Sequence, residues 1–301
     1  MKHLMILLTA TACALGYPNG ITPTNANVID VLAQYERFKE HYVVSSGCND
    51  PQNMLRVLRG DDHSNGEFQG YGLQFASMLE GDETVAKKLW AYAKSVLNGR
   101  GLMPWDISAG GQILGAAAAA DGDVDISMGL DRAAFRWGGE FDAAATTYVK
   151  NMAWQLTNYS GKAHCRQRVL VGAINGDGCG HYLNYIAFAH FPRFHARDAG
   201  AGWMGSVLTK CWSLFDYAYQ NYRLPPWYVT KTGKIAKPND PWGTPGARWD
   251  AGATRVAWRV GTRALVANDD NAQKWAERIV EVFNNNRSEE RRVGKECATG
   301  C

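Results

Sequence analysis

Acidic and aromatic residues gather with glycine in three segments of the sequence. Residues 65–72 read NGEFQGYG and place three glycines around the carboxylate of Glu67. Residues 119–126 read AADGDVDI and include Asp121, and residues 248–259 read RWDAGATRVAWR and include Asp250. A pair of carboxyl groups can donate a proton to one atom and activate water at another. Glu67, Asp121 and Asp250 are therefore candidate catalytic residues.

Each of these residues also has a plain structural interpretation. A glutamate at the start of a helix is common, and an aspartate there is by default an N-cap. The alternating aspartates after residue 120 could suggest a calcium loop, but an EF-hand needs Gly at its sixth position and Glu at its twelfth. Ile126 and Arg132 stand at those positions. We therefore predict no metal ion and no cofactor.

Aromatic residues are unusually abundant, with 11 Trp, 13 Tyr and 10 Phe among 301 residues. Many lie beside Gly, Asp and Asn, which suits stacking on the flat apolar faces of sugars, although tryptophan can equally fill a helical core. The 32 basic and 29 acidic side chains give a net charge of +3. A nucleic-acid-binding protein that works by neutralising phosphates is therefore disfavoured.

The two ends differ from the rest of the chain. Residues 1–16 read MKHLMILLTATACALG, with a basic start, an apolar stretch and small residues, and are predicted to be a signal peptide. We expect a secreted or periplasmic protein without a membrane span, with lipid attachment at Cys13 as an alternative. Residues 287–301 are charged and lack an apolar period, so we expect a non-native or disordered tail. Residues 17–286 remain as the folded domain.

Four cysteines lie between these ends: Cys48, Cys165, Cys179 and Cys211. In an exported protein one disulfide is plausible, and Cys165 with Cys179 is the most local pairing. The sequence contains no CxxC pair, which argues against a zinc site.

Apolar residues recur at helical spacing through most of the body. Asn27 is placed to cap a helix through Tyr42. Further helices are expected at 70–80, 82–98, 124–137, 139–158, 183–196, 201–222, 254–268 and 270–285. Only residues 168–174 resemble a strand. Helical pairs with long loops favour an all-α fold, a barrel of helical hairpins rather than a solenoid, because no repeat is visible.

Five segments in order resemble glycoside hydrolase family 8, the endoglucanases, xylanases and chitosanases built on an (α/α)6 barrel. They are GE with GYG at 66–72, LMPW at 102–105, AADGDVDI with Trp137, the aromatic segment 184–194, and WDA with RVAWR at 249–259. The resemblance runs from about residue 17 to 285. The family barrel has twelve helices and nine are expected here, so the last helices could be missing.

The resemblance implies a role for each acidic residue. Glu67 would be the general acid and Asp250 the base that activates water, which gives inversion at the anomeric carbon. Asp121 would hold the sugar at the cleavage point. Candidate substrate-binding residues, which would stack on sugars or position water, are Tyr71, Trp105, Tyr185, Trp249 and Arg255. The pattern departs from the family at Trp249, where tyrosine is usual, and in a longer spacing between Asp250 and Arg255.

We therefore expect a monomeric, secreted, endo-acting β-1,4-glycanase whose partner is a polysaccharide, either cellulose or a related β-glucan. A xylanase of the same family is the first alternative. An inactive or truncated barrel that only binds carbohydrate is the second, and a helical lyase or α-glycosidase would need other acidic residues. A chitosanase is disfavoured because a nearly neutral chain would not attract a polycation.

Overall fold

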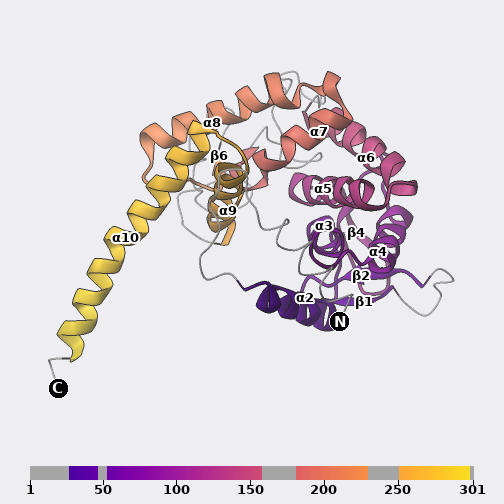
Figure 1. Ribbon diagram of the computed structural model, residues 1–301, viewed down its shortest axis with the longest axis horizontal. Helices are drawn as coiled ribbons and strands as arrows, with labels where there is room; N and C mark the ends of the chain where they lie inside the picture. The colour runs from indigo at the N-terminus through magenta and orange to yellow at the C-terminus, as the bar shows by residue number, and fades with distance from the viewer. Residues whose placement is uncertain (1–26, 47–52, 158–180, 230–250, 299–301) are drawn as a thin grey trace, which may run out of the picture. The chain divides into compact units, whose positions relative to one another are not determined.

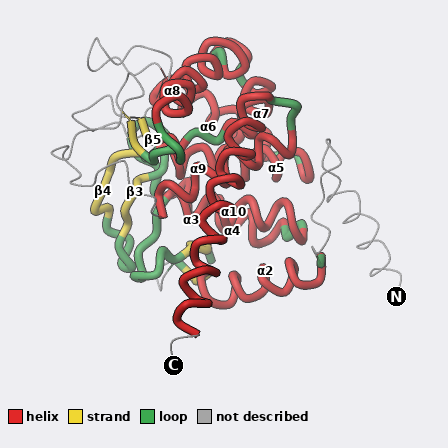
Figure 2. Tube along the Cα trace, turned by 90° about the vertical axis from the view of Figure 1, so that its left-hand side faces the viewer, coloured by secondary structure: helices red, strands yellow, loops and turns green. Residues whose placement is uncertain are grey.

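The computed structural model describes residues 27–46, 53–157, 181–229 and 251–298. Helices dominate this part of the chain, and the strands are short (Figures 1 and 2). The α-helices are α2 (Val28–Tyr42), α3 (Gly66–Phe75), α4 (Glu83–Ser95), α5 (Ala120–Trp137), α6 (Glu140–Thr157), α7 (Phe191–Arg197), α8 (Leu208–Asn221), α9 (Ala251–Val266) and α10 (Asp270–Ala298). In the part that the structure describes, no helix is both long and apolar enough to cross a membrane.

Three antiparallel strand pairs connect the helices in the described ranges. They are β1 (Val43–Ser45) with β2 (Leu55–Val57), β3 (Pro104–Ile107) with β4 (Ile113–Ala118), and β5 (His181–Tyr182) with β6 (Tyr228–Val229). In the β3–β4 hairpin Pro104 pairs with Ala118 and Ile107 with Ile113, with an irregular register between them. The expectation of a single strand was therefore wrong, and residues 168–174, where it was placed, lie outside the described residues.

The chain divides into two compact units. The first comprises residues 1–179 and 190–211, and the second comprises residues 180–189 and 212–301. In the first unit α5 packs against both α3 and α6 (Figure 1). Its core includes the fully buried side chains Leu73, Leu89, Val124, Ile126 and Val149.

The second unit has its own aromatic core. Phe188 stacks on Trp212 with ring centroids 3.8 Å apart and planes inclined by 7°. Phe215 meets Trp275 of α10 edge to face at 6.1 Å. Helix α9 packs against α10 and against the turn at Leu183–Tyr185.

Most helix boundaries agree with the sequence prediction, and Asn27 caps α2 by accepting a hydrogen bond from the backbone nitrogen of Ile29 at 3.0 Å. Three helices begin three or four residues earlier than predicted: α3 at Gly66, α5 at Ala120 and α9 at Ala251. In α3 and α5 the segments that contain glycine and aspartate or glutamate are therefore the first turns of the helices.

Two other regions also differ from the prediction. The helix expected at 183–196 consists of short 3-10 turns followed by α7. Helix α10 continues to Ala298, where the sequence indicated a tail without regular structure after residue 286. The Glu, Arg and Lys residues of that segment have good helix propensity even without an apolar period.

Candidate active site

Glu67 lies in the first turn of α3. Asn65 caps this helix, because its side-chain oxygen accepts a hydrogen bond from the backbone nitrogen of Phe68 at 2.9 Å. The side chain of Glu67 is buried, and the hydroxyl of Tyr71, one turn further on, donates to Glu67 Oε1 at 2.6 Å. Tyr71 is thus a partner of the carboxyl group, and its role in stacking on sugar or positioning water stays a prediction.

Glycines bring α3 and α5 into backbone contact. A Cβ atom added at Gly122 would lie 2.6 Å from the backbone nitrogen of Glu67, and one added at Gly70 would lie 2.6 Å from Asp125 Cβ. A third close approach occurs at Gly129, further along both helices. Because the contacts advance in the same direction on both helices, α3 and α5 run parallel. Their N-terminal ends, which carry Glu67 and Asp121, therefore lie side by side.

Asp121 and Asp123 occupy the first turn of α5, and both are buried. The backbone nitrogen of Gly122 donates to Asp121 Oδ1 at 2.9 Å. The N-terminal ends of two helices also favour negative charge at this position.

Asp123 has the opposite electrostatic environment. Burial, with a smaller contribution from the neighbouring charge of Asp121, raises the pKa of its carboxyl group to about 8. The hydroxyl of Tyr148 on α6 donates to Asp123 Oδ1 at 2.6 Å. This hydrogen bond lowers the pKa of Asp123 by less than burial raises it. At neutral pH Asp123 is therefore protonated.

Tyr148 links Asp123 to the segment at residues 102–105. The backbone nitrogen of Met103 donates to the Tyr148 hydroxyl at 3.0 Å, and both residues are buried. Neither Tyr148 nor Asp123 was predicted from the sequence as a site residue. Asp123 stands inside the recognised motif and could have been found there. Tyr148 is separated from it by 25 residues and carries no local signal.

Trp105 is presented by the β3–β4 hairpin. Its side chain is 45% exposed. A Cβ atom at Gly115 of β4 would overlap its indole, so glycine at that position gives the ring its room. A flat, exposed indole fixed on a hairpin can stack against a sugar ring.

A polar network ties the hairpin to the segment that precedes α3. The side chain of His63 lies 2.8 Å from Asp106 Oδ1, and Arg59 lies 3.4 Å from the same oxygen. Ser64 and Ile107 exchange backbone hydrogen bonds of 2.8 and 3.0 Å. The sequence analysis missed these residues, which fix Trp105 relative to the start of α3.

The other predicted site residues lie in the second unit or outside the described residues. Tyr185, in the second unit, is partly exposed and stacks on Tyr182 with centroids 4.7 Å apart. Arg255 lies on α9 in the same unit and is partly exposed. Trp249 and Asp250 lie outside the described residues. Within the described ranges, no group of His, Cys, Asp or Glu side chains could hold a metal ion.

Endoglucanases are among the sequence relatives of the chain. It is 29% identical over 231 residues to endoglucanase C of Ruminiclostridium cellulolyticum, covering 73% of this chain and 49% of that protein. It is 26% identical over 283 residues to endoglucanase A of Acetivibrio thermocellus, covering 89% of this chain and 56% of that protein. The chain thus spans about half the length of the curated relatives it matches.

Solved structures show the same fold. A β-1,3-1,4-glucanase from Paenibacillus sp. X4 superposes with a TM-score of 0.78 at 21% identity, covering 89% of this chain and 75% of that one. Rex8A from Paenibacillus barcinonensis, complexed with xylose, gives 0.68 at 18% identity, covering 86% and 73%. This likeness confirms the expected all-α, (α/α)6 fold class. The family model for glycosyl hydrolases family 8 matches residues 10–294, and the chain therefore belongs to that family.

Proposed function

We propose that the chain is a secreted, endo-acting β-1,4-glycanase that hydrolyses cellulose or a related β-glucan with inversion. The observation that carries this proposal is the placement of Glu67 and Asp121, two buried carboxyl groups, at adjoining N-terminal ends of α3 and α5. Family membership supplies the reaction class, and the endoglucanase relatives favour β-glucan as the substrate.

Glu67 acts as the general acid in this mechanism. Glu67 Oε1 accepts the hydrogen bond from Tyr71, so the proton to be transferred belongs on Oε2. Protonation of the glycosidic oxygen makes the departing sugar a neutral alcohol, which lowers the barrier to cleavage. Tyr71 is a positioning residue that orients the carboxyl group from one helical turn away.

Asp250 is proposed as the base that removes a proton from the attacking water. This role rests on the resemblance of residues 249–259 to the family motif. Inversion requires room for that water, so the carboxyl groups of Glu67 and Asp250 should lie about 6.5–9.5 Å apart. Asp121 is proposed to bind the sugar at the cleavage point, where its negative charge stabilises the positive charge that develops on the ring.

A second candidate is hydrolysis of xylan by the same residues. The structural likeness to Rex8A, which was solved in complex with xylose, supports this candidate. A third candidate is a barrel that binds carbohydrate without cleaving it. Measuring the release of reducing ends distinguishes all three.

The deciding experiment measures this release from carboxymethylcellulose, lichenan, xylan and chitosan side by side, for the parent chain and for Glu67→Gln. We expect the parent to act on the glucans and the variant to be at least about 10²-fold slower. The first product should be the α-anomer. Faster release from xylan than from the glucans would favour the second candidate, and no release from any polymer would favour the third. A β-anomeric product would contradict inversion.

A further inference from the structure

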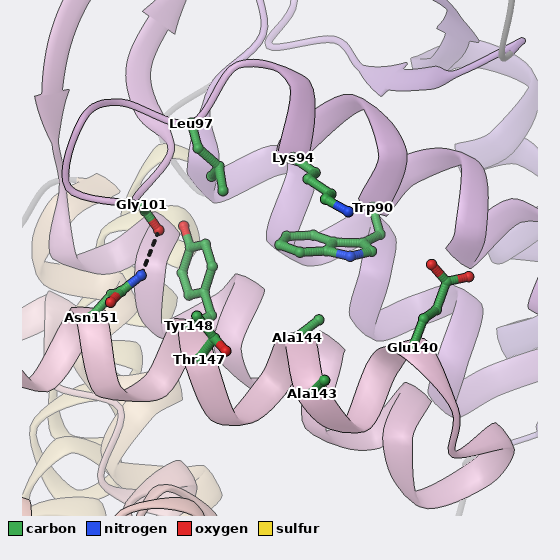
Figure 3. A pocket seen from close by; sticks show the side chains of 10 residues that line it. All are labelled: Trp90, Lys94, Leu97, Gly101, Glu140, Ala143, Ala144, Thr147, Tyr148 and Asn151. Atoms are coloured by element: carbon green, nitrogen blue, oxygen red, sulfur yellow. Dashed lines mark hydrogen bonds between the residues drawn. The ribbon is translucent and has the colours of Figure 1, made fainter.

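A cavity of 380 Å³ opens between α4 and α6 of the first unit (Figure 3), and Tyr148, whose hydroxyl donates to Asp123, lies in its wall. None of the proposed catalytic or substrate-binding residues lines it. Its walls include Trp90, Lys94, Glu140, Thr147, Tyr148 and Asn151. The volume lies within the range of about 300–1,000 Å³ that is usual for ligand pockets.

The cavity exists because a large ring on one helix faces small residues on the other. The indole of Trp90 on α4 lies across from Ala143 and Ala144 on α6, whose methyl groups leave the space between the helices open (Figure 3). Trp90 packs edge to face with Tyr148, with ring centroids 6.1 Å apart. Trp90, which is 7% exposed, and the buried Tyr148 therefore border the open space together.

Hydrogen-bonding groups surround this aromatic wall. Lys94, Glu140 and Thr147 are exposed at the rim. The side-chain nitrogen of Asn151 makes a long contact of 3.5 Å to the carbonyl oxygen of Gly101, and its side-chain oxygen remains able to accept a hydrogen bond. The rim thus offers donors and acceptors, with one positive and one negative side chain.

The same face of α6 continues beyond the cavity to an exposed tryptophan. Ala144, Thr147, Asn151 and Trp154 follow one another at spacings of three and four residues, so they form one stripe along the helix. Trp154 is 68% exposed, which is unusual for so large an apolar ring. From Ala144 to Trp154 the stripe is about 15 Å long. A ligand that contacts both aromatic residues must be elongated.

This combination favours a neutral carbohydrate chain over other ligands. A nucleic acid would require a surplus of basic side chains, and the rim has both signs of charge. An amphipathic helix would require a continuous apolar groove, whereas here aromatic rings alternate with polar groups. Sugars present flat apolar faces with hydroxyl groups at their edges, which matches rings flanked by amide, hydroxyl and charged side chains.

We propose that the groove formed by Trp90, Ala144, Thr147, Asn151 and Trp154 is a second binding site for a neutral polysaccharide, on the α4–α6 side of the first unit. The choice of a polysaccharide as the ligand rests on the proposed glycanase function. The site would hold the polymer without taking part in its cleavage. Its loss should weaken binding to long chains and leave hydrolysis of short ones unchanged.

The test is native gel electrophoresis through gels that contain barley β-glucan, hydroxyethylcellulose or xylan. Glu67→Gln serves as the parent, so that the polymer is not degraded during the run. Trp154→Ala removes the exposed ring, and Ala144→Phe fills the space in front of Trp90. Phe135→Ala, which removes another exposed ring from α5, is the matched control. Thermal melting checks that each variant folds.

We expect Trp154→Ala and Ala144→Phe to weaken retardation by the best-bound polymer by about fivefold or more, and Phe135→Ala to leave it unchanged. Equal retardation of the parent and of both groove variants would overturn the proposal, as would no retardation of the parent by any polymer. An equal loss in Phe135→Ala would also overturn it.

A parallel measurement separates this proposal from the proposed function. The groove variants are made with Glu67 intact, and hydrolysis of a short soluble oligosaccharide is followed. Unchanged hydrolysis with reduced retardation supports both proposals. Reduced retardation in a chain that hydrolyses no polymer supports the second site and refutes the glycanase. A loss of oligosaccharide hydrolysis equal to the loss of retardation would show that the groove belongs to the catalytic site.

Discussion

The α3–α5 and α4–α6 interfaces of the first unit are both built with small residues, yet one is closed and the other open. Between α3 and α5, glycines from both helices let the backbones touch at Gly70 and Gly122. Between α4 and α6, Ala143 and Ala144 face the indole of Trp90, and 380 Å³ of space remains. Small residues close an interface when they lie opposite backbone, and they leave it open when they lie opposite a large rigid ring.

The closed interface suits catalysis, which needs fixed groups, and the open interface suits binding, which needs space. At the closed interface Glu67 and Asp121 are buried at adjoining helix ends, and their positions depend on the backbone of two helices. Proton transfer requires such fixed geometry. The open interface can admit a ligand but contains no comparable pair of carboxyl groups among its described residues.

The closed interface should be the more sensitive to an added methyl group. Gly70→Ala would place its Cβ atom 2.6 Å from Asp125 Cβ and 2.7 Å from the Ile126 nitrogen. Forcing the helices apart should cost about 1–3 kcal/mol. The better helix propensity of alanine would offset up to about 1 kcal/mol of that cost. We expect a lower melting temperature and reduced activity.

Gly261→Ala on α9 is the matched control, because a Cβ atom there meets nothing within 4 Å. It should leave stability unchanged or raise it by up to about 1 kcal/mol. If both variants melted at the same temperature, backbone contact between α3 and α5 would not be a constraint on the fold.

The protonation state of Asp123 should be visible in the dependence of stability on pH. Its pKa is raised from 3.8 to about 8 in the folded chain. Between these values the folded state retains a proton that the unfolded chain loses, so this contribution to stability is full below about pH 4 and lost as the pH rises to about 8. Asp123→Asn removes that dependence. Its melting temperature relative to the parent should therefore increase with pH.

Tyr148→Phe keeps the carboxyl group while removing its donor, so it should retain the downward slope with rising pH. A constant difference between the parent and Asp123→Asn from pH 4 to 8 would mean that Asp123 is ionised throughout that range in the folded chain.

The open interface should tolerate added volume with the smallest effect. Ala144→Phe places a ring in space that is already empty, so we expect the free energy of unfolding to change by less than about 1.5 kcal/mol in either direction. Thermal or denaturant unfolding measures it. Destabilisation as large as that of Gly70→Ala would show that α4 and α6 are in closer contact than the structure indicates.

The sequence predicted the long helices well because their apolar periods and caps are local signals. Asn27 and the spacing of apolar residues after it were sufficient to place α2. The prediction from the sequence failed at the start of α3 and α5, because glycine and aspartate are poor helix formers. Those residues are helical because the two backbones pack against each other, and this contact has no local signature. The paired strands were missed because two to six residues are too few to show an alternating pattern.

The candidate site was predicted in part for a similar reason. Glu67 and Asp121 were identified from motifs, and the structure places them at neighbouring helix ends; their catalytic roles stay predictions. Tyr148 was missed, because its hydrogen bond to Asp123 joins residues far apart in the sequence. Asp250 was identified from its motif alone and lies outside the described residues.

The most direct test of the central claim asks whether Glu67 delivers a proton to the leaving group. Glu67→Gln and the parent are compared on the best polymer substrate and on a 2,4-dinitrophenyl glycoside of the same sugar, whose leaving group departs without protonation. We predict that the variant is at least about 10²-fold slower on the polymer but within about tenfold of the parent on the dinitrophenyl glycoside. Equal loss on both substrates, or no loss on the polymer, would contradict the assignment of Glu67 as the general acid.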